Sequence, residues 1–92
     1  MNEPTIVLFR ADRSGPTKGE VTAVFPEHKE GPGLYSCYGH IGQHSSCSRG
    51  WYQSTRAAKP EEYADLKTEL ESYGPPDAHY NLIVRKRWPP GL

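Results

Sequence analysis

The chain has 92 residues, 35% of them hydrophobic and 24% charged, and its 11 Lys and Arg balance 11 Asp and Glu. This length predicts a single domain over residues 1–92, and the balanced charge excludes the overall basic field that recruits nucleic acid or membranes. The apolar run after Met1 is too short for a signal peptide or a membrane span, so we expect a cytoplasmic protein without membrane contact.

Two β-rich runs open the chain. Residues 5–10 and 20–26 are rich in β-branched and aromatic residues, and the turn-forming residues 12–16 separate them. This arrangement predicts a β-hairpin or a close relative of one. Residues 26–33, which are rich in Glu, Lys, Pro and Gly, are expected to form a solvated loop.

Two further strands are predicted in the middle of the chain. Aromatic residues concentrate in residues 34–38 and again in residues 51–55, which favours β-structure. The segment between them, residues 39–50, contains three glycines and is expected to be a long loop. Function is most naturally expected there, because loops often carry binding residues.

One helix is predicted after Pro60. Proline is favoured at the first helical position, and Glu61 and Glu62 favour the positive end of the helix dipole. Gly74 is expected to end the helix. The apolar positions recur at intervals of three or four residues and form one face, which consists of Tyr63, Leu66, Leu70 and Tyr73.

A last strand over residues 81–85 completes the expected order ββββαβ. Such an order predicts an α+β domain. We expect a mostly antiparallel sheet of four to five strands, with the single α-helix packed on one of its faces.

The central segment contains a pattern of soft metal ligands. Cys37, His40, His44 and Cys47 supply two thiols and two imidazoles, which in composition suit a tetrahedral zinc site. The histidine spacing suits a helical turn, however, and glycines discourage a helix there. We favour a segment without metal or other cofactor, in which the thiols are free and pack as small apolar groups. A structural zinc-binding domain remains an alternative.

The same segment also has features of an anion-binding loop. Its glycines allow backbone N–H groups to turn inward, and polar side chains add donors. Aromatic residues on the flanking strands suit stacking on a base, although they equally suit a core. The donors are His40, Gln43, His44 and Arg49, and the aromatic residues are Tyr35, Tyr38, Trp51 and Tyr52.

The sequence has no catalytic signature. A catalytic nucleophile needs a base that activates it and a group that orients the base. The histidines lie near Ser36, Ser45 and Ser46, but their order does not match a known arrangement. We therefore expect a protein that is not an enzyme.

Charge is unevenly distributed along the chain. The predicted helix carries five acidic residues against Lys67, whereas three basic residues follow the last strand. Such charged faces are usually only solvated. The acidic face also suits docking on a protein that handles nucleic acid, and the basic end also suits contact with phosphates. The acidic residues are Glu61, Glu62, Asp65, Glu69 and Glu71, and the basic ones are Arg85, Lys86 and Arg87.

Four stretches, Gly19–Glu27, Ser36–His44, Lys59–Leu66 and Leu82–Arg87, resemble a family of small, largely uncharacterised proteins of tailed phages and bacteria. That family shares a G-E-x-x-A-x-F-P-E strand, an S-Y-x-H-x-G-Q-H-G loop and a K-P-x-x-x-E-Y-x-D-L helix. The family tends to have Ser in place of Cys37 in this chain, which weakens the zinc interpretation. The resemblance implies a phage accessory protein.

This setting predicts a non-enzymatic inhibitor of host defence, of the anti-CRISPR type, that docks on a host protein or nucleoprotein complex in the host cytoplasm. The alternative is a small-ligand module that binds or sequesters a nucleotide or phosphate through residues 40–44. The candidate partner- or ligand-binding residues are Tyr38, His40, Gln43, His44, Arg49, Arg85, Lys86 and Arg87.

Overall fold

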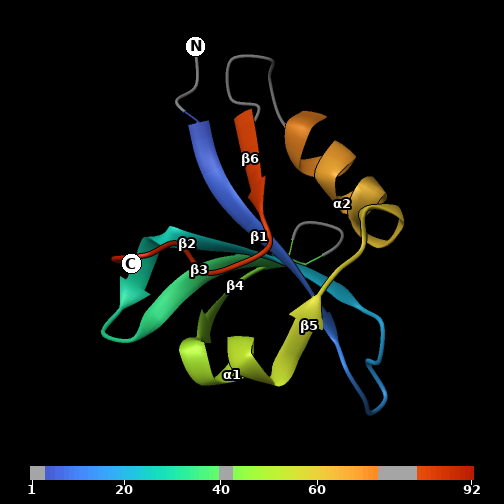
Figure 1. Ribbon diagram of the computed structural model, residues 1–92, viewed down its shortest axis with the longest axis horizontal. Coiled ribbons are helices and arrows are strands. Elements are labelled where there is room, and N and C mark those ends of the chain that lie inside the picture. Colours follow the sequence, from blue (N-terminus) through green and yellow to red (C-terminus); the bar gives the residue numbers. More distant parts are fainter. Residues whose placement is uncertain (1–3, 40–42, 73–80) are drawn as a thin grey trace.

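The computed structural model describes residues 4–39, 43–72 and 81–92 of the chain (Figure 1). The described residues form an α+β domain of six strands and two helices, which confirms the expected fold class. Along the chain these elements are β1 (Pro4–Asp12), β2 (Val21–Gly31), β3 (Leu34–Gly39), β4 (Gln43–Ser48), α1 (Arg49–Ser54), β5 (Thr55–Ala57), α2 (Pro60–Ser72) and β6 (Asn81–Arg85).

The sheet is mostly antiparallel, as predicted. Five strands follow one another in the order β4-β3-β2-β1-β5, and β6 joins as a sixth strand parallel to β1. Both β6 and β5 pair with β1 but along different parts of it: β6 pairs as far as Leu8, and β5 pairs from Arg10 onward. Phe9 therefore lies between the part of β1 that pairs with β6 and the part that pairs with β5.

The larger core lies between the sheet and α2. Alternate residues of β1 point to one face, so Val7, Phe9 and Ala11 share a cluster with Leu66 and Leu70 of α2. This confirms the predicted apolar face of the helix at these two leucines. Tyr73 and Gly74, the other residues predicted for the helix end, lie outside the described residues.

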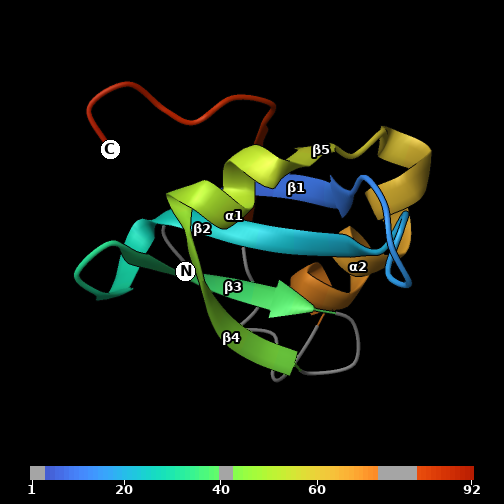
Figure 2. The same cartoon turned by 90° about the horizontal axis from the view of Figure 1, so that it is seen from below.

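A second core lies on the opposite face of the sheet. Leu8 and Val24 point there, together with Tyr35, Tyr52 and both cysteines. Helix α1 and the C-terminal segment lie over this face (Figure 2). Trp88 of that segment contacts Tyr35 and Tyr52 edge-on, with ring centroids 4.7 and 5.0 Å apart. The expectation of one helix on one face is thus incomplete, because α1 and the C-terminal segment cover the other face.

The helix α1 replaces most of the strand predicted over residues 51–55. Ser48 caps the helix, because its Oγ accepts a hydrogen bond from the Trp51 N–H at 3.1 Å. The helix places Tyr52 in the second core. Thr55, the last residue of the predicted strand, begins β5.

The solvated loop predicted over residues 26–33 is also largely wrong. Strand β2 continues to Gly31, and Lys29 still pairs with Tyr35. The register shifts between Phe25 and Lys29, so the strand bulges there, and its charged residues remain exposed. Strand β4 likewise occupies part of the expected loop over residues 39–50.

The start of α2 is fixed by Glu62. Its Oε1 accepts a hydrogen bond from the Lys59 backbone N–H at 2.8 Å, which is one half of a capping box. Its two carboxylate oxygens also accept hydrogen bonds from Arg56, at 2.8 and 2.7 Å. The hydrogen bonds from Arg56, with that from Lys59, lower the pKa of Glu62 to about 2. Neither helix of the described residues is long and apolar enough to cross a membrane.

Candidate functional site

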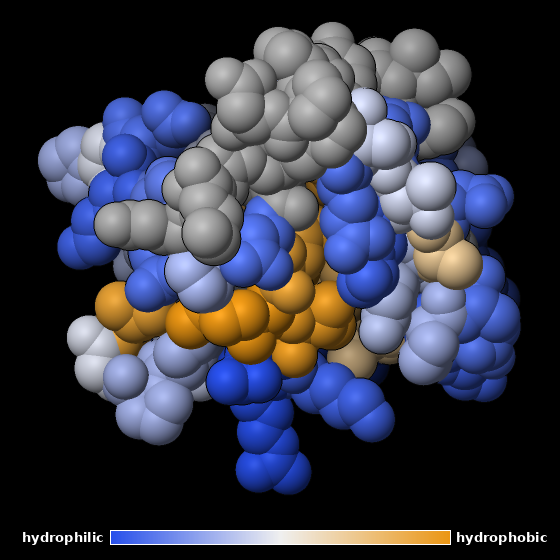
Figure 3. All heavy atoms as spheres, turned by 90° about the horizontal axis from the view of Figure 1, so that it is seen from above, coloured by the Kyte–Doolittle hydropathy of each residue, from blue (hydrophilic) through white to orange (hydrophobic). Residues whose placement is uncertain are grey.

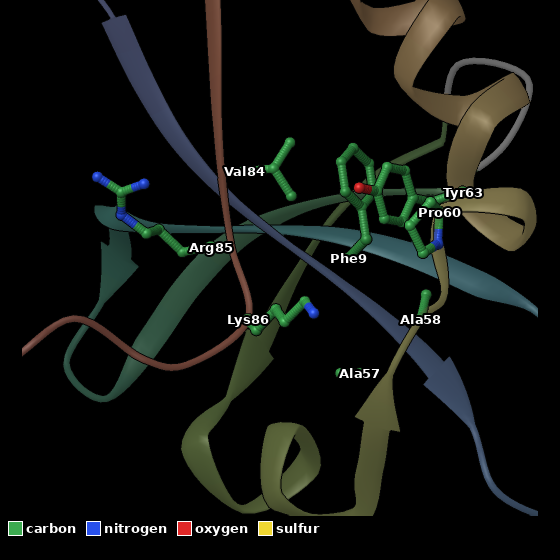
Figure 4. A pocket seen from close by; sticks show the side chains of 8 residues that line it. All are labelled: Phe9, Ala57, Ala58, Pro60, Tyr63, Val84, Arg85 and Lys86. Atoms are coloured by element: carbon green, nitrogen blue, oxygen red, sulfur yellow. The ribbon is translucent and has the colours of Figure 1, made fainter.

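A cavity of about 180 Å³ lies beside Phe9, where β1 passes from its pairing with β6 to its pairing with β5. One wall comes from α2 and the segment before it, and the other comes from β6 and Lys86 (Figure 4). The eight residues that line this pocket are Phe9, Ala57, Ala58, Pro60, Tyr63, Val84, Arg85 and Lys86.

The interior of the pocket is apolar. The rings of Phe9 and Tyr63 stack with centroids 4.4 Å apart and an interplanar angle of 11°. The Ala58 N–H donates a hydrogen bond to the Phe9 carbonyl at 2.9 Å, which holds the segment before α2 against β1. Val84 adds a branched aliphatic group from the opposite wall. Such a lining favours an apolar guest.

The rim of the pocket is basic. The Lys86 side chain extends toward the cavity, whereas the Arg85 guanidinium points to the other side of β6 (Figure 4). Arg85, Lys86 and Arg87 are all exposed, and none of them pairs with a carboxylate among the described residues. Figure 3 shows hydrophobic side chains that reach the surface in a band between hydrophilic ones, on the side of the molecule where α2 and β6 lie in Figure 1.

The acidic face of α2 is smaller than the sequence suggests. Glu62 pairs with Arg56, and Glu71 pairs with Lys67 at 2.9 Å. Glu69 accepts a hydrogen bond from the Tyr38 hydroxyl. These three carboxylates serve contacts within the domain. Glu61 and Asp65 are exposed and have no such contact with another residue in the described part of the chain.

Tyr38 belongs to the core and not to a binding surface. Its side chain is 1% exposed and lies in the cluster beneath α2. The ring of His44 packs against it edge-on, with centroids 4.7 Å apart. Stacking of a ligand on Tyr38, as the sequence suggested, would require this core to open.

His44 and Arg49 do not form one site. His44 is the second residue of β4, whereas Arg49 follows the end of that strand and begins α1, so at about 3.3 Å per residue their backbones lie on the order of 15 Å apart. The Arg49 guanidinium lies 4.1 Å from the centre of the Trp88 ring, on the side of the second core. His40 falls outside the described residues, and Gln43 is described only as the residue that pairs with Gly39.

A second hollow, of about 270 Å³, lies at His44. It is lined by Glu30, His44, Ser45 and Ser46. The carboxylate of Glu30 opposes binding of an anion there. Among its described lining residues, this hollow therefore lacks the assembled cationic donors that a phosphate site needs.

The strand register also separates the proposed zinc ligands. Cys37 pairs with Ser45 and Cys47 with Tyr35, so both thiols point toward the second core. His44 pairs with Tyr38 and therefore points to the opposite face. The described residues contain no group of three or more His, Cys, Asp or Glu placed to hold a metal ion. His44 therefore does not share a face of the sheet with the two thiols.

Both thiols are free and buried, at 3% and 7% exposure. A hydrogen bond from Cys47 lowers the pKa of Cys37, with a smaller contribution from Ser45, whose Oγ lies 3.0 Å from the Cys37 sulfur. The same hydrogen bond raises the pKa of Cys47 well above its usual range. The cysteines thus act as paired, buried core groups.

Comparison with protein-family models, curated proteins and solved structures finds no match for this chain. The resemblance to phage proteins therefore stays a prediction. Of the predicted binding residues, Arg85 and Lys86 line the pocket and Arg87 follows them. Sequence reasoning missed Phe9 and Val84 as pocket residues, because the local sequence around each of them is typical of any strand.

Proposed function

We propose that this chain is a non-enzymatic binding protein that docks on a host protein or nucleoprotein complex in the cytoplasm, as a phage inhibitor of host defence does. The observation that supports this proposal is the apolar pocket beside the exposed basic segment Arg85–Arg87. A pocket of this kind, with a charged rim, is typical of the anchor points at the centre of protein interfaces.

The size of the pocket favours a protein partner. Pockets that hold whole ligands measure roughly 300–1,000 Å³, whereas a cavity of about 150 Å³ is enough for a benzene ring. At about 180 Å³, the pocket beside Phe9 fits one apolar side chain better than a nucleotide. His44 and Arg49 also lie apart and do not form one binding site. We therefore place the small-ligand alternative second.

The experiment combines a cellular assay with a binding assay. Phage plating is measured on hosts with and without a defence system, in the presence of the wild-type chain, Lys86→Glu, Ala57→Leu and the control Lys18→Glu. Ala57 is exposed and lines the pocket, so leucine there alters the lining without truncating a core side chain. Lys18 is an exposed residue of the β1–β2 turn, remote from the pocket lining.

We expect the wild-type chain and Lys18→Glu to protect phage only in defended hosts and to co-purify with the defence effector. The two pocket variants should lose both properties while keeping the wild-type thermal midpoint. Equal plating with and without the wild-type chain, across defended hosts that differ in their effector complexes, would overturn the inhibitor proposal.

A further inference from the structure

The pocket also indicates the chemistry of the partner. Building on the docking function proposed above, we infer that the bound element is an acidic polypeptide segment, in which one aromatic or branched apolar side chain enters the pocket and carboxylates beside it face Lys86. Protein and nucleic acid are both components of a nucleoprotein complex, and this inference assigns the contact to the protein.

The apolar interior favours a side chain over a nucleobase. The Phe9 and Tyr63 rings stack on each other at 4.4 Å, so no slot is left between them for a planar base. Single-stranded nucleic acid is usually held by aromatic side chains whose faces are open to successive bases. The lining of Val84 and Ala58 instead offers the aliphatic contacts that an anchor side chain uses in an interface.

The distribution of charge also favours carboxylates over a phosphate chain. Lys86 extends toward the pocket, and Arg85 points to the other side of β6, so the basic groups do not form one continuous groove (Figure 4). Binding along a nucleic-acid backbone depends on several such contacts in a row. One ammonium group at the rim suits one or two carboxylates next to an apolar anchor.

The test is an NMR titration of the isotope-labelled full chain with four synthetic peptides. They carry phenylalanine flanked by aspartate and glutamate, phenylalanine flanked by serine, alanine flanked by aspartate and glutamate, and phenylalanine flanked by lysine. We expect the acidic phenylalanine peptide to shift the amide signals of Ala57, Tyr63 and Val84, and to bind about fivefold more tightly than the serine version. The acidic alanine peptide should leave these signals unchanged.

Charge reversal at the rim provides the sharpest control. Lys86→Glu should weaken the acidic phenylalanine peptide and strengthen the lysine-flanked one, whereas Lys18→Glu should change neither. A twenty-nucleotide oligo-dT or oligo-U that shifted the same amides with higher affinity than the acidic peptide would overturn the inference in favour of nucleic acid.

The two proposals fail in different ways. If no peptide shifts the pocket amides, but Ala57→Leu and Lys86→Glu still abolish phage protection, the acidic segment is wrong and the docking function stands. If the acidic peptide binds as expected, but both variants protect phage as well as the wild-type chain does, the docking function is wrong and the pocket chemistry stands.

Discussion

The guanidinium group of Arg10 lies 4.2 Å from the centre of the Tyr52 ring, beneath α1. Its nitrogens donate hydrogen bonds to the Thr55 hydroxyl at 2.8 Å and to the Thr55 carbonyl at 2.6 Å. Burial lowers the pKa of Arg10 from its usual value, and its side chain links β1 to the junction between α1 and β5.

Replacing this buried side chain should therefore destabilise the domain. Arg10→Met keeps most of the apolar stem but removes the donor to the Thr55 hydroxyl and one of the two donors to the Thr55 carbonyl. We expect a loss of about 1–3 kcal/mol in the free energy of unfolding, measured by urea denaturation. Arg13→Met is the matched control, because Arg13 donates to the same carbonyl from an exposed position. An equal effect of the two variants would contradict the buried role of Arg10.

The packing of α2 on the sheet predicts a second effect. Leu70 is 1% exposed in the larger core, so Leu70→Ala should cost about 2–5 kcal/mol, which is enough to unfold many domains of this size. The exposed Thr68→Ala on the same helix should leave the denaturation midpoint nearly unchanged. If Leu70→Ala also left it unchanged, the placement of the helix would be wrong.

The carboxylate of Glu62 should make stability depend on acid pH. Its folded-state pKa of about 2 lies below the usual value of 4.5, so its stabilising contribution is complete above about pH 4.5 and is lost as the pH falls toward 2. Glu62→Gln should thus lower the thermal midpoint at pH 7 and have a much smaller effect near pH 2. Glu61→Gln is the control, since Glu61 is the neighbouring carboxylate outside the Arg56 pair. A pH-independent effect of Glu62→Gln would exclude this linkage.

The separation of the cysteines from His44 predicts how the chain responds to loss of metal. Treatment with a chelator should leave the thermal midpoint unchanged, because the thiols pack in the second core. Cys37→Ser should lower the midpoint by replacing a buried sulfur of the second core with a smaller, more polar group, whereas His44→Ala, at an exposed position, should have a smaller effect. One tightly held zinc per chain in elemental analysis, with equal losses in both variants, would refute this assignment.

The sequence predicted the elements that carry strong local patterns. The alternation around Phe25 and the spacing of Leu66 and Leu70 are local features. Both elements were found, although β2 continues beyond the predicted run to Gly31. Helix α1 was mistaken for a strand because Trp51 and Tyr52 favour β-structure, whereas the cap at Ser48 and burial of Tyr52 decided the outcome.

The remaining features depend on contacts between distant residues. Strand β4 has a polar sequence without apolar alternation. It forms a strand because its backbone pairs with β3. The exposure of Arg85–Arg87 was predictable from charge. The pocket was not, because it forms only when Val84 pairs with Val7, next to Phe9. No local pattern encodes a parallel pairing between the two ends of the described chain.

That pairing of β6 with β1 has a consequence for the order of folding. Bringing β1 and β6 together closes most of the chain into a loop, which is entropically costly. Contacts between residues so distant in sequence tend to form slowly. The hairpin of β1 and β2 and the helix α2 are more local, and they can assemble before β6 arrives. The pocket beside Phe9 and Tyr63 lacks one wall until β6 pairs with β1, and Val84 completes it. A ligand in the pocket would consequently bind only chains in which β6 has docked, and would slow the local opening of that strand.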